Sequence, residues 1–502
     1  MAARVLRPLP SDAFDFQAAR HLLSRAGFGG TPQQVQALAN LGLDEAVDHL
    51  VEFEQHPAEP VRPDDFDHDI MKPWTDEQRE QLRRAREMQD EDTIDAFRQE
   101  RQRRQRADRR QMAAIERWWW QRLLTTQRPL EEKLTLFWHG HFATGYRKIE
   151  DSYHLFMQNE LFRRHAAGRF SDLVAAIIRD PAMLAYLDNH RSRRGAPNEN
   201  FARELMELFT MGESSGYTER DVAEAARALT GYTFHDDSFV FRESWHDDGE
   251  KTILGRRGRW DGDDLVRIIL EQRVVSEYLC RKLYRFFIND APNGFDDTAR
   301  AFIRRLARQL RENNYRLKPV LRTLFASEHF YDPANRGAII KSPVQLIAET
   351  VRTCRAPLRS LDAIRSASDL MGQKLFTPPS VKGWDGGRTW INTSTLYVRQ
   401  NAVAYLLTGR SPAGQDWEQD RKQNDTPWDG RHLLDADLLD TDDASTTAPV
   451  RRLLRFMLHV EPDASRAEAL DAFVEQHGGR ITAPVMTGLM SIIAAMPEYQ
   501  LC

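Results

Sequence analysis

The chain has 502 residues, of which 41% are hydrophobic and 29% are charged, and its 70 basic and 75 acidic residues give a net charge of −5. This near balance argues against a nucleic-acid-binding protein, and a chain of this length exceeds one ordinary core, so we expect several helical subdomains. The three cysteines, Cys280, Cys354 and Cys502, form no CxxC pair, which argues against a disulfide framework, a zinc knuckle and a covalently attached haem.

The N-terminal sequence MAARVLRPLPSDAFDF contains no apolar h-region, and no run of about 18 apolar residues occurs in the chain. We therefore expect neither a secretory signal nor a membrane span. The expected location is the cytoplasm, with export alongside a signal-bearing partner as the alternative.

Helix signals begin near the N-terminus. Thr31 is an N-cap followed by proline at the first helical position, and the helix that it opens is predicted to stop at Gly42. A capping box at Thr75 and Gln78 predicts a polar helix that runs to Thr125. Acidic residues are interleaved with its arginines, so we interpret residues 61–112 as a solvated, charged arm that does not bind nucleic acid.

The rest of the chain is predicted to be helical with a few interruptions. The amphipathic helices lie at residues 153–167, 170–178, 218–229, 265–270, 276–287, 296–312, 318–327 and 343–352. The interruptions are a loop or small hairpin within 234–254, an ordered loop rich in Gly, Pro and Trp over 372–392, and a polar, acidic stretch over 411–447.

These signals predict an all-α fold: a multi-helix globular array with an ordered Gly/Pro/Trp-rich loop and a long charged helical arm. The predicted units are an N-terminal helical segment (1–60), the charged arm (61–112), a main helical domain with the site (113–410), an acidic linker or insertion (411–448), and C-terminal helices that pack on the main domain (449–502).

Two histidines flank a glycine in the apolar sequence Phe-Trp-His-Gly-His-Phe. On a helix, His139 and His141 point about 200° apart and cannot bind one ion, whereas on an extended segment they share one side. Gly140 between them makes a helix end plausible. The pair is therefore a candidate metal-ligand pair if the helix stops there, and the alternative is histidines that hydrogen-bond locally.

Two glutamates lie on one face of the predicted helix in NENFARELMELF. Glu204 and Glu207 are three residues apart, so their carboxylates repel unless a cation, a proton or an arginine such as Arg203 lies between them. A buried salt-bridge network explains this pattern, and a metal or acid/base site explains it as well.

Two loops add further candidates. His246 and Asp247, in a glycine-flanked loop, complete a metal site or orient a base, although such sequences also form ordinary turns. The loop after Phe376 is a rigid platform that lines a binding cleft or covers the core. The residues that we assign to substrate binding are Trp384, Trp390, Lys382, Arg388 and Asn200.

Many ordered blocks of this chain resemble the domain of unknown function 1800 family of bacteria. They include EEKLTLFWHGHFATG, NENFARELMELFTMGE, HDDGEKTILG, LFTPPSVKGWDGGRTWINTSTLYVRQN and MPEYQL, and together they cover most of the chain outside 53–111 and 411–447. The resemblance implies a mostly helical protein. It also implies a co-encoded partner of the domain of unknown function 1501 family, which is similar to sulfatases and alkaline phosphatases.

Our leading hypothesis is a metal-dependent enzyme that acts with that sulfatase-like partner. The residues expected to hold one or two divalent ions are His139, His141, Glu204, Glu207, His246 and Asp247. Glu204, Glu207 and Arg203 are the catalytic candidates. A mixed imidazole and carboxylate set suits iron, manganese or zinc.

Iron implies an oxidoreductase, which the tryptophan-rich surroundings favour, and zinc or manganese implies a hydrolase. The alternatives are a non-catalytic helical scaffold or maturation partner, and a glycan- or polyanion-binding protein.

Overall fold

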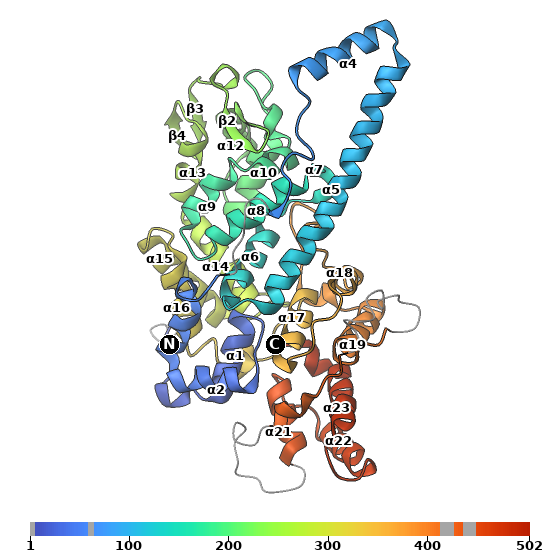
Figure 1. The fold of residues 1–502 in the computed structure, drawn as a ribbon. Coiled ribbons are helices and arrows are strands. Elements are labelled where there is room, and N and C mark those ends of the chain that lie inside the picture. The colour runs from blue at the N-terminus through green and yellow to red at the C-terminus, as the bar shows by residue number, and fades with distance from the viewer. Residues whose placement is uncertain (1–5, 59–64, 412–425, 435–447) are drawn as a thin grey trace.

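The computed structural model describes residues 6–58, 65–411, 426–434 and 448–502. Helices form most of this part of the chain, and its strands form two small antiparallel hairpins, so the predicted all-α class is confirmed (Figure 1). None of the helices in these ranges is long and apolar enough to cross a membrane.

The N-terminal helices are α1 (Phe16–Ala26), α2 (Pro32–Leu41) and α3 (Leu43–Val51). Thr31 caps α2 in a full capping box, and the helix stops at Gly42, whose φ of 77° is readily adopted by glycine, as the sequence predicted. Helix α1 packs on α2, and α3 packs on α16 (Leu317–Ala326).

The charged arm is built from two helices, α4 (Asp76–Met88) and α5 (Glu91–Thr125), and it projects from the body (Figure 1). The capping box at Thr75 is confirmed, but the prediction of one helix from Thr75 to Thr125 is wrong. The chain turns at Gln89, which has a left-handed φ of 55°, and the Asp90 side chain then accepts the Thr93 amide and caps α5. The predicted boundary at residue 112 falls inside α5.

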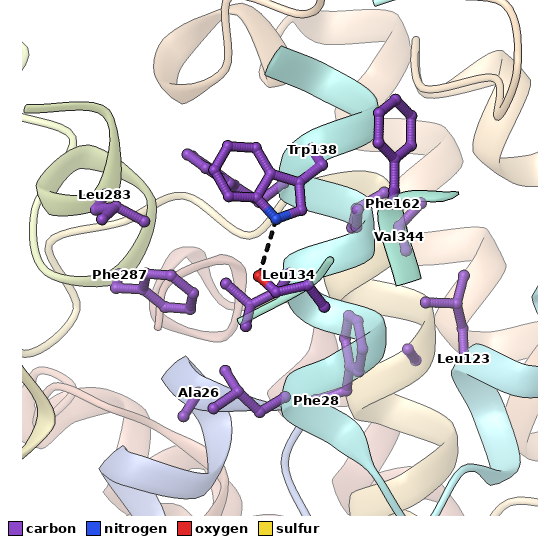
Figure 2. Close-up of a cluster of buried hydrophobic side chains, with 14 of the residues drawn as sticks. Ala26, Phe28, Leu123, Leu134, Trp138, Phe162, Leu283, Phe287 and Val344 are labelled. Atoms are coloured by element: carbon purple, nitrogen blue, oxygen red, sulfur yellow. Dashed lines mark hydrogen bonds between the residues drawn. The ribbon is translucent and has the colours of Figure 1, made fainter. Parts of the chain in front are cut away.

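Helix α6 (Pro129–His141) lies at the centre of the fold, and almost all of its residues are buried. Side chains from distant segments surround Leu134 and Trp138 of this helix in Figure 2: Ala26, Phe28, Leu123, Phe162, Leu283, Phe287 and Val344. The Trp138 indole donates to the carbonyl of Ala166 over 2.9 Å, so the polar atom of this buried ring has a partner.

Short helices and two hairpins follow. The helices are α7 (Tyr146–Ile149), α8 (Ser152–Arg164), α9 (Phe170–Ile177), α10 (Pro181–Tyr186), α11 (Glu199–Glu204) and α12 (Glu219–Ala228). The hairpins are β1 (Tyr232–His235) with β2 (Ser238–Phe241), and β3 (Lys251–Ile253) with β4 (Arg256–Gly258). The predicted hairpin region therefore holds parts of two hairpins.

The predicted helices of the second half are confirmed as α13 (Gly262–Leu270), α14 (Arg273–Phe287), α15 (Asp297–Glu312), α16 and α17 (Pro343–Cys354). They are followed by α18 (Leu361–Leu370), α19 (Thr393–Thr408), α21 (Ala448–Met457), α22 (Ala464–Gln476) and α23 (Ala483–Ala495). Between α18 and α19 the predicted ordered loop contains only a short 3₁₀ helix, Gly387–Trp390.

Most of the predicted acidic linker, residues 412–425 and 435–447, lies outside the described residues. Residues 426–434 between them pack on the body. Trp428 and Leu433 are buried, and the Trp428 indole donates to the carbonyl of Cys354 over 2.7 Å.

Candidate functional site

The two histidines of the predicted metal pair point to different neighbours, because α6 continues through both of them. The His139 Nε2 accepts the backbone amide of Phe376 over 3.0 Å. The His141 Nε2 donates to the carbonyl of Phe209 over 2.9 Å. The helix ends only at His141, so the 200° divergence expected for a helical pair holds.

Both imidazoles are neutral at physiological pH. Burial lowers the pKa of each to about 3, since a charged ring loses its hydration in this apolar surrounding. The ring of His139 lies against Trp119 and Trp384, whereas that of His141 lies against Phe137 and Phe142. Each histidine thus joins α6 to a segment distant in the sequence through a backbone hydrogen bond, and neither bonds locally within its own helix.

The Gly/Pro/Trp-rich loop sits directly on α6. A Cβ at Gly383 would lie 2.2 Å from the carbonyl oxygen of Gly140, and Gly383 also has a φ of +82°. The Tyr146 amide donates to the Phe376 carbonyl over 2.9 Å. Only glycine permits this approach at position 383, whereas a Cβ at Gly140 would have no other atom within 4 Å. We call residues 139–141 and 376–390 together the motif junction.

The predicted substrate-binding residues differ in their environments. Trp384 is half-buried beside His139, and Trp390 is buried. Lys382 and Arg388 are exposed on the same loop. Asn200 lies apart from this loop, in the first turn of α11, where its backbone amide donates to Asn198 Oδ1 over 2.9 Å.

The glutamates of the NENFARELMELF segment join an arginine network. Arg203 lies 3.1 Å from Glu199, 2.8 Å from Glu219 and 3.7 Å from Glu207. Burial, and then the charge of Glu207, raises the pKa of Glu204. The chain from Leu205 to Thr210 is π-helical, a rare geometry that occurs mostly at functional sites.

The loop with His246 and Asp247 is held by other partners. The His246 Nδ1 donates to the carbonyl of Thr230 over 2.9 Å. Asp247 accepts Nε and Nη2 of Arg227 at 2.8 and 3.1 Å, and this bond lowers its pKa to about 2. The pair therefore attaches this loop, which lies between the two hairpins in the chain, to the C-terminal end of α12.

Within the described ranges, no group of three or more His, Cys, Asp or Glu side chains is placed to hold a metal ion. Within these ranges the imidazoles of His139 and His141 therefore do not converge with the carboxylates of Glu204 and Glu207 on a metal position. A bound iron, manganese or zinc ion, and the catalytic roles of Glu204, Glu207 and Arg203, stay predictions.

A buried ionic network, which the sequence analysis missed, surrounds Glu349 of α17. This carboxylate accepts Ser24 Oγ at 3.1 Å and Gln345 Nε2 at 2.6 Å. It lies 3.2 Å from Lys341 Nζ and 3.5 Å from His459 Nε2. Glu349 and His459 are each 7% exposed and Lys341 is 1% exposed.

The Glu349 carboxylate of this network stays ionised although burial disfavours its charged form. Burial alone would raise the pKa of Glu349, but Lys341 and His459 lower it well below its usual range, so the carboxylate is ionised. Burial lowers the pKa of His459 to about 3, and lowers that of the neighbouring Lys133 to about 8. Groups with such shifts occur preferentially at functional sites.

A cleft of about 1070 Å³ adjoins this network, and His459 lines it. We call it the arginine cleft, because five arginines line it: Arg20 of α1, Arg336, and Arg451, Arg452 and Arg455 of α21. Glu461, Glu468 and Asp471 line it as well. His459 also lines a second, small cavity of about 10 Å³ together with Glu349, Lys341 and Ser24.

One pattern in the sequence pointed to this network. Gln345 and Glu349 are four residues apart on one side of α17, and Lys341 lies four residues before Gln345, just ahead of the helix. The partners Ser24 and His459 come from opposite ends of the chain, and no spacing connects them.

Comparisons with known proteins give one family. Neither a curated protein nor a solved structure matches the chain. The family described as "Protein of unknown function (DUF1800)" matches residues 21–501, which is nearly the whole chain. The match includes the motif junction and most of the arginine cleft, but Arg20 of the cleft lies just before it. The protein therefore belongs to this family, as the resemblance of its sequence blocks indicated.

Proposed function

We propose that the protein binds an anionic organic ligand in the arginine cleft. One observation carries the proposal: Arg20, Arg336, Arg451 and Arg455 line a single cleft, and none of them forms an ion pair with another described residue. A guanidinium without a carboxylate partner keeps its donors available for a carboxylate, phosphate or sulfate group.

The guanidinium groups of Arg20 and Arg336 influence each other at one part of the cleft. Burial lowers the pKa of Arg20 to about 10. The Glu349 carboxylate opposes this shift, and the like charge of Arg336 adds to it. Arg20 already donates to Gln17 and to the carbonyl of Phe456, which hold its side chain in place. An anion between the two guanidinium groups would offset their repulsion.

The acidic residues and the size of the cleft restrict the ligand further. Glu461, Glu468 and Asp471 also line the cleft, so the ligand carries cationic or hydroxyl groups besides its anionic group. A volume of about 1070 Å³ lies at the upper end of small-molecule pockets, which suits a ligand of a few sugar or amino-acid units. This proposal retains the polyanion-binding alternative and moves it from the Lys382 loop to the cleft.

Titration calorimetry with sodium sulfate and with a sulfated disaccharide tests the proposal. We expect binding of both probes, and a loss of affinity of about tenfold or more in Arg336→Glu and in Arg451→Glu, because each reversal opposes the anion. Arg308→Glu on the exposed face of α15 is the matched control, since Arg308 lies outside the cleft. An equal effect of all three substitutions would overturn the proposal.

A second candidate function is metal-dependent catalysis at Glu204 and Glu207. It is supported by the π-helical stretch that contains Glu207, and by the proximity that lets Glu207 raise the pKa of Glu204. Metal analysis of tag-free protein tests it. Stoichiometric iron, manganese or zinc that is lost in Glu204→Gln supports this function. Metal-free protein would exclude it.

A further inference from the structure

His459 occupies a position between the buried network and the arginine cleft. Its Nε2 faces Glu349 at 3.5 Å, and its Nδ1 is buried without a hydrogen-bond partner. The residue lines both the small cavity beside Glu349 and the cleft itself. A buried polar nitrogen without a partner is uncommon, and here it lies next to the cleft that we propose to take an anion.

The position of Glu349 fixes which nitrogen carries the proton. An ionised carboxylate can only accept hydrogen bonds, so the Nε2 facing it is protonated in the neutral ring. Nδ1 then holds a lone pair. The ring can accept one more proton there, and it would become a hydrogen-bond donor at that position.

The groups around His459 explain why this proton is absent before a ligand binds. Glu349 of α17 favours it, but Lys341 also faces this carboxylate and offsets its charge. Arg20 and His21 approach from α1, and the rings of His21 and His459 lie 6.2 Å apart. Across the cleft, Arg336 and the arginines of α21 add positive charge, whereas Glu468 and Asp471 of α22 line the cleft beyond the buried network.

We infer that an anion entering the arginine cleft takes up one proton from water with it, and that His459 Nδ1 holds this proton and donates it to the anion. The inference rests on the proposed anion-binding function. The balance is simple: the neutral imidazole gains one solvent proton and becomes an imidazolium, one N–H bond forms, and no other covalent bond changes. The anion supplies the opposite charge that the protonated ring lacks in the empty cleft.

Calorimetric titration of sodium sulfate between pH 5 and pH 8 tests the inference, because sulfate keeps its double charge over this range. We expect the association constant at pH 5 to exceed that at pH 8 by tenfold or more. We also expect the heat to depend on the ionisation enthalpy of the buffer, with an uptake approaching one proton per sulfate. His459→Gln should still bind sulfate at pH 8 and should lose the gain at pH 5.

The controls separate this inference from the proposed function. His477→Gln removes an exposed histidine at the C-cap of α22 and should keep the wild-type pH dependence. Should His459→Gln not fold, the imidazole signals of the wild-type protein, followed by NMR with and without sulfate, report the same protonation.

Three results are decisive. Absence of sulfate and disaccharide binding at every pH overturns the proposed function together with the inference. Sulfate binding without proton uptake overturns the inference alone. Proton uptake that persists unchanged in His459→Gln also overturns it.

Discussion

The motif junction and the arginine cleft are opposite kinds of structure. At the junction, histidines, glycines and tryptophans that are dense in the sequence meet through backbone contacts, and His139 and His141 are neutral and each bonded to a backbone group. At the cleft, residues scattered from α1 to α22 gather charges, and Arg20, Arg336, Arg451 and Arg455 have no ion-pair partner among the described residues. A dense motif can thus mark close packing, whereas the charges on which we base the proposed function come from segments that are far apart in the sequence.

The largest expected effect tests whether the network beside the cleft depends on its charges. Lys341→Met leaves the Glu349 carboxylate buried without its cation, and we expect a loss of about 3–5 kcal/mol in the free energy of unfolding by urea denaturation. Lys374→Met, which removes a partly exposed ion pair with Asp369, should cost less than about 1 kcal/mol. Similar losses in both variants would contradict a special role for the buried pair.

A glycine substitution tests whether the close backbone contact at Gly383 stabilises the motif junction. Gly383→Ala places a Cβ against the Gly140 carbonyl and adds backbone strain, so we expect a loss of about 3 kcal/mol. Gly386→Ala, at a φ of +74° and with a Cβ that would lie 3.9 Å from Trp390 Nε1, shares the strain without the clash and should cost about 1 kcal/mol. Thermal unfolding of the two variants measures the difference, and equal costs would leave strain as the whole explanation.

The pH dependence of stability probes the neutral histidines of the junction. The pKa of His139 is about 3 in the folded protein, against a usual value of 6.5. The unfolded chain therefore binds more protons below pH 6.5, and stability is lost as the pH falls from there toward 3. From pH 7.5 to pH 5 we expect His139 to contribute a loss of about 2 kcal/mol.

Urea denaturation of the wild type and of His139→Gln at the two pH values checks this expectation. The variant should lose less stability on acidification than the wild type, by about the same 2 kcal/mol, because glutamine does not titrate in this range. An unchanged pH dependence would mean that the pKa of His139 is the same in the folded and the unfolded protein, which would contradict its burial as a neutral ring.

The smallest effect belongs to the arm, which lies outside both regions and gives a baseline. Asp90→Ala removes the N-cap of α5, and we expect a cost of about 1 kcal/mol in urea denaturation. Sulfate binding should stay at the wild-type level. A change in sulfate affinity in this variant would connect the arm to the cleft and weaken the contrast between the regions.

The sequence predicted those parts of the fold whose causes are local. Capping boxes at Thr31 and Thr75 began helices where they were expected, because their bonds span only three residues. The turn at Gln89 was missed, since glutamine is not a residue that typically adopts a left-handed φ.

The candidate sites were harder to predict, because they depend on contacts between distant residues. The chemistry of His139 and His141 suggested a metal, but their directions follow from the continuation of α6 and from where Phe376 and Phe209 lie. Ser24, Glu349 and His459 meet only in the folded chain, so no spacing in the sequence could join them.

Helix α5 is anchored to the body near its middle. Asp108 is buried there and accepts the Ser152 amide and the Tyr146 hydroxyl, with about 26 Å of helix on either side of it. The outer half ends at the exposed tip of the arm, and the inner half carries Trp119, whose ring touches those of His139 and Phe376. The charged arm and the motif junction are therefore joined by one continuous helix, which Asp108 anchors near its midpoint.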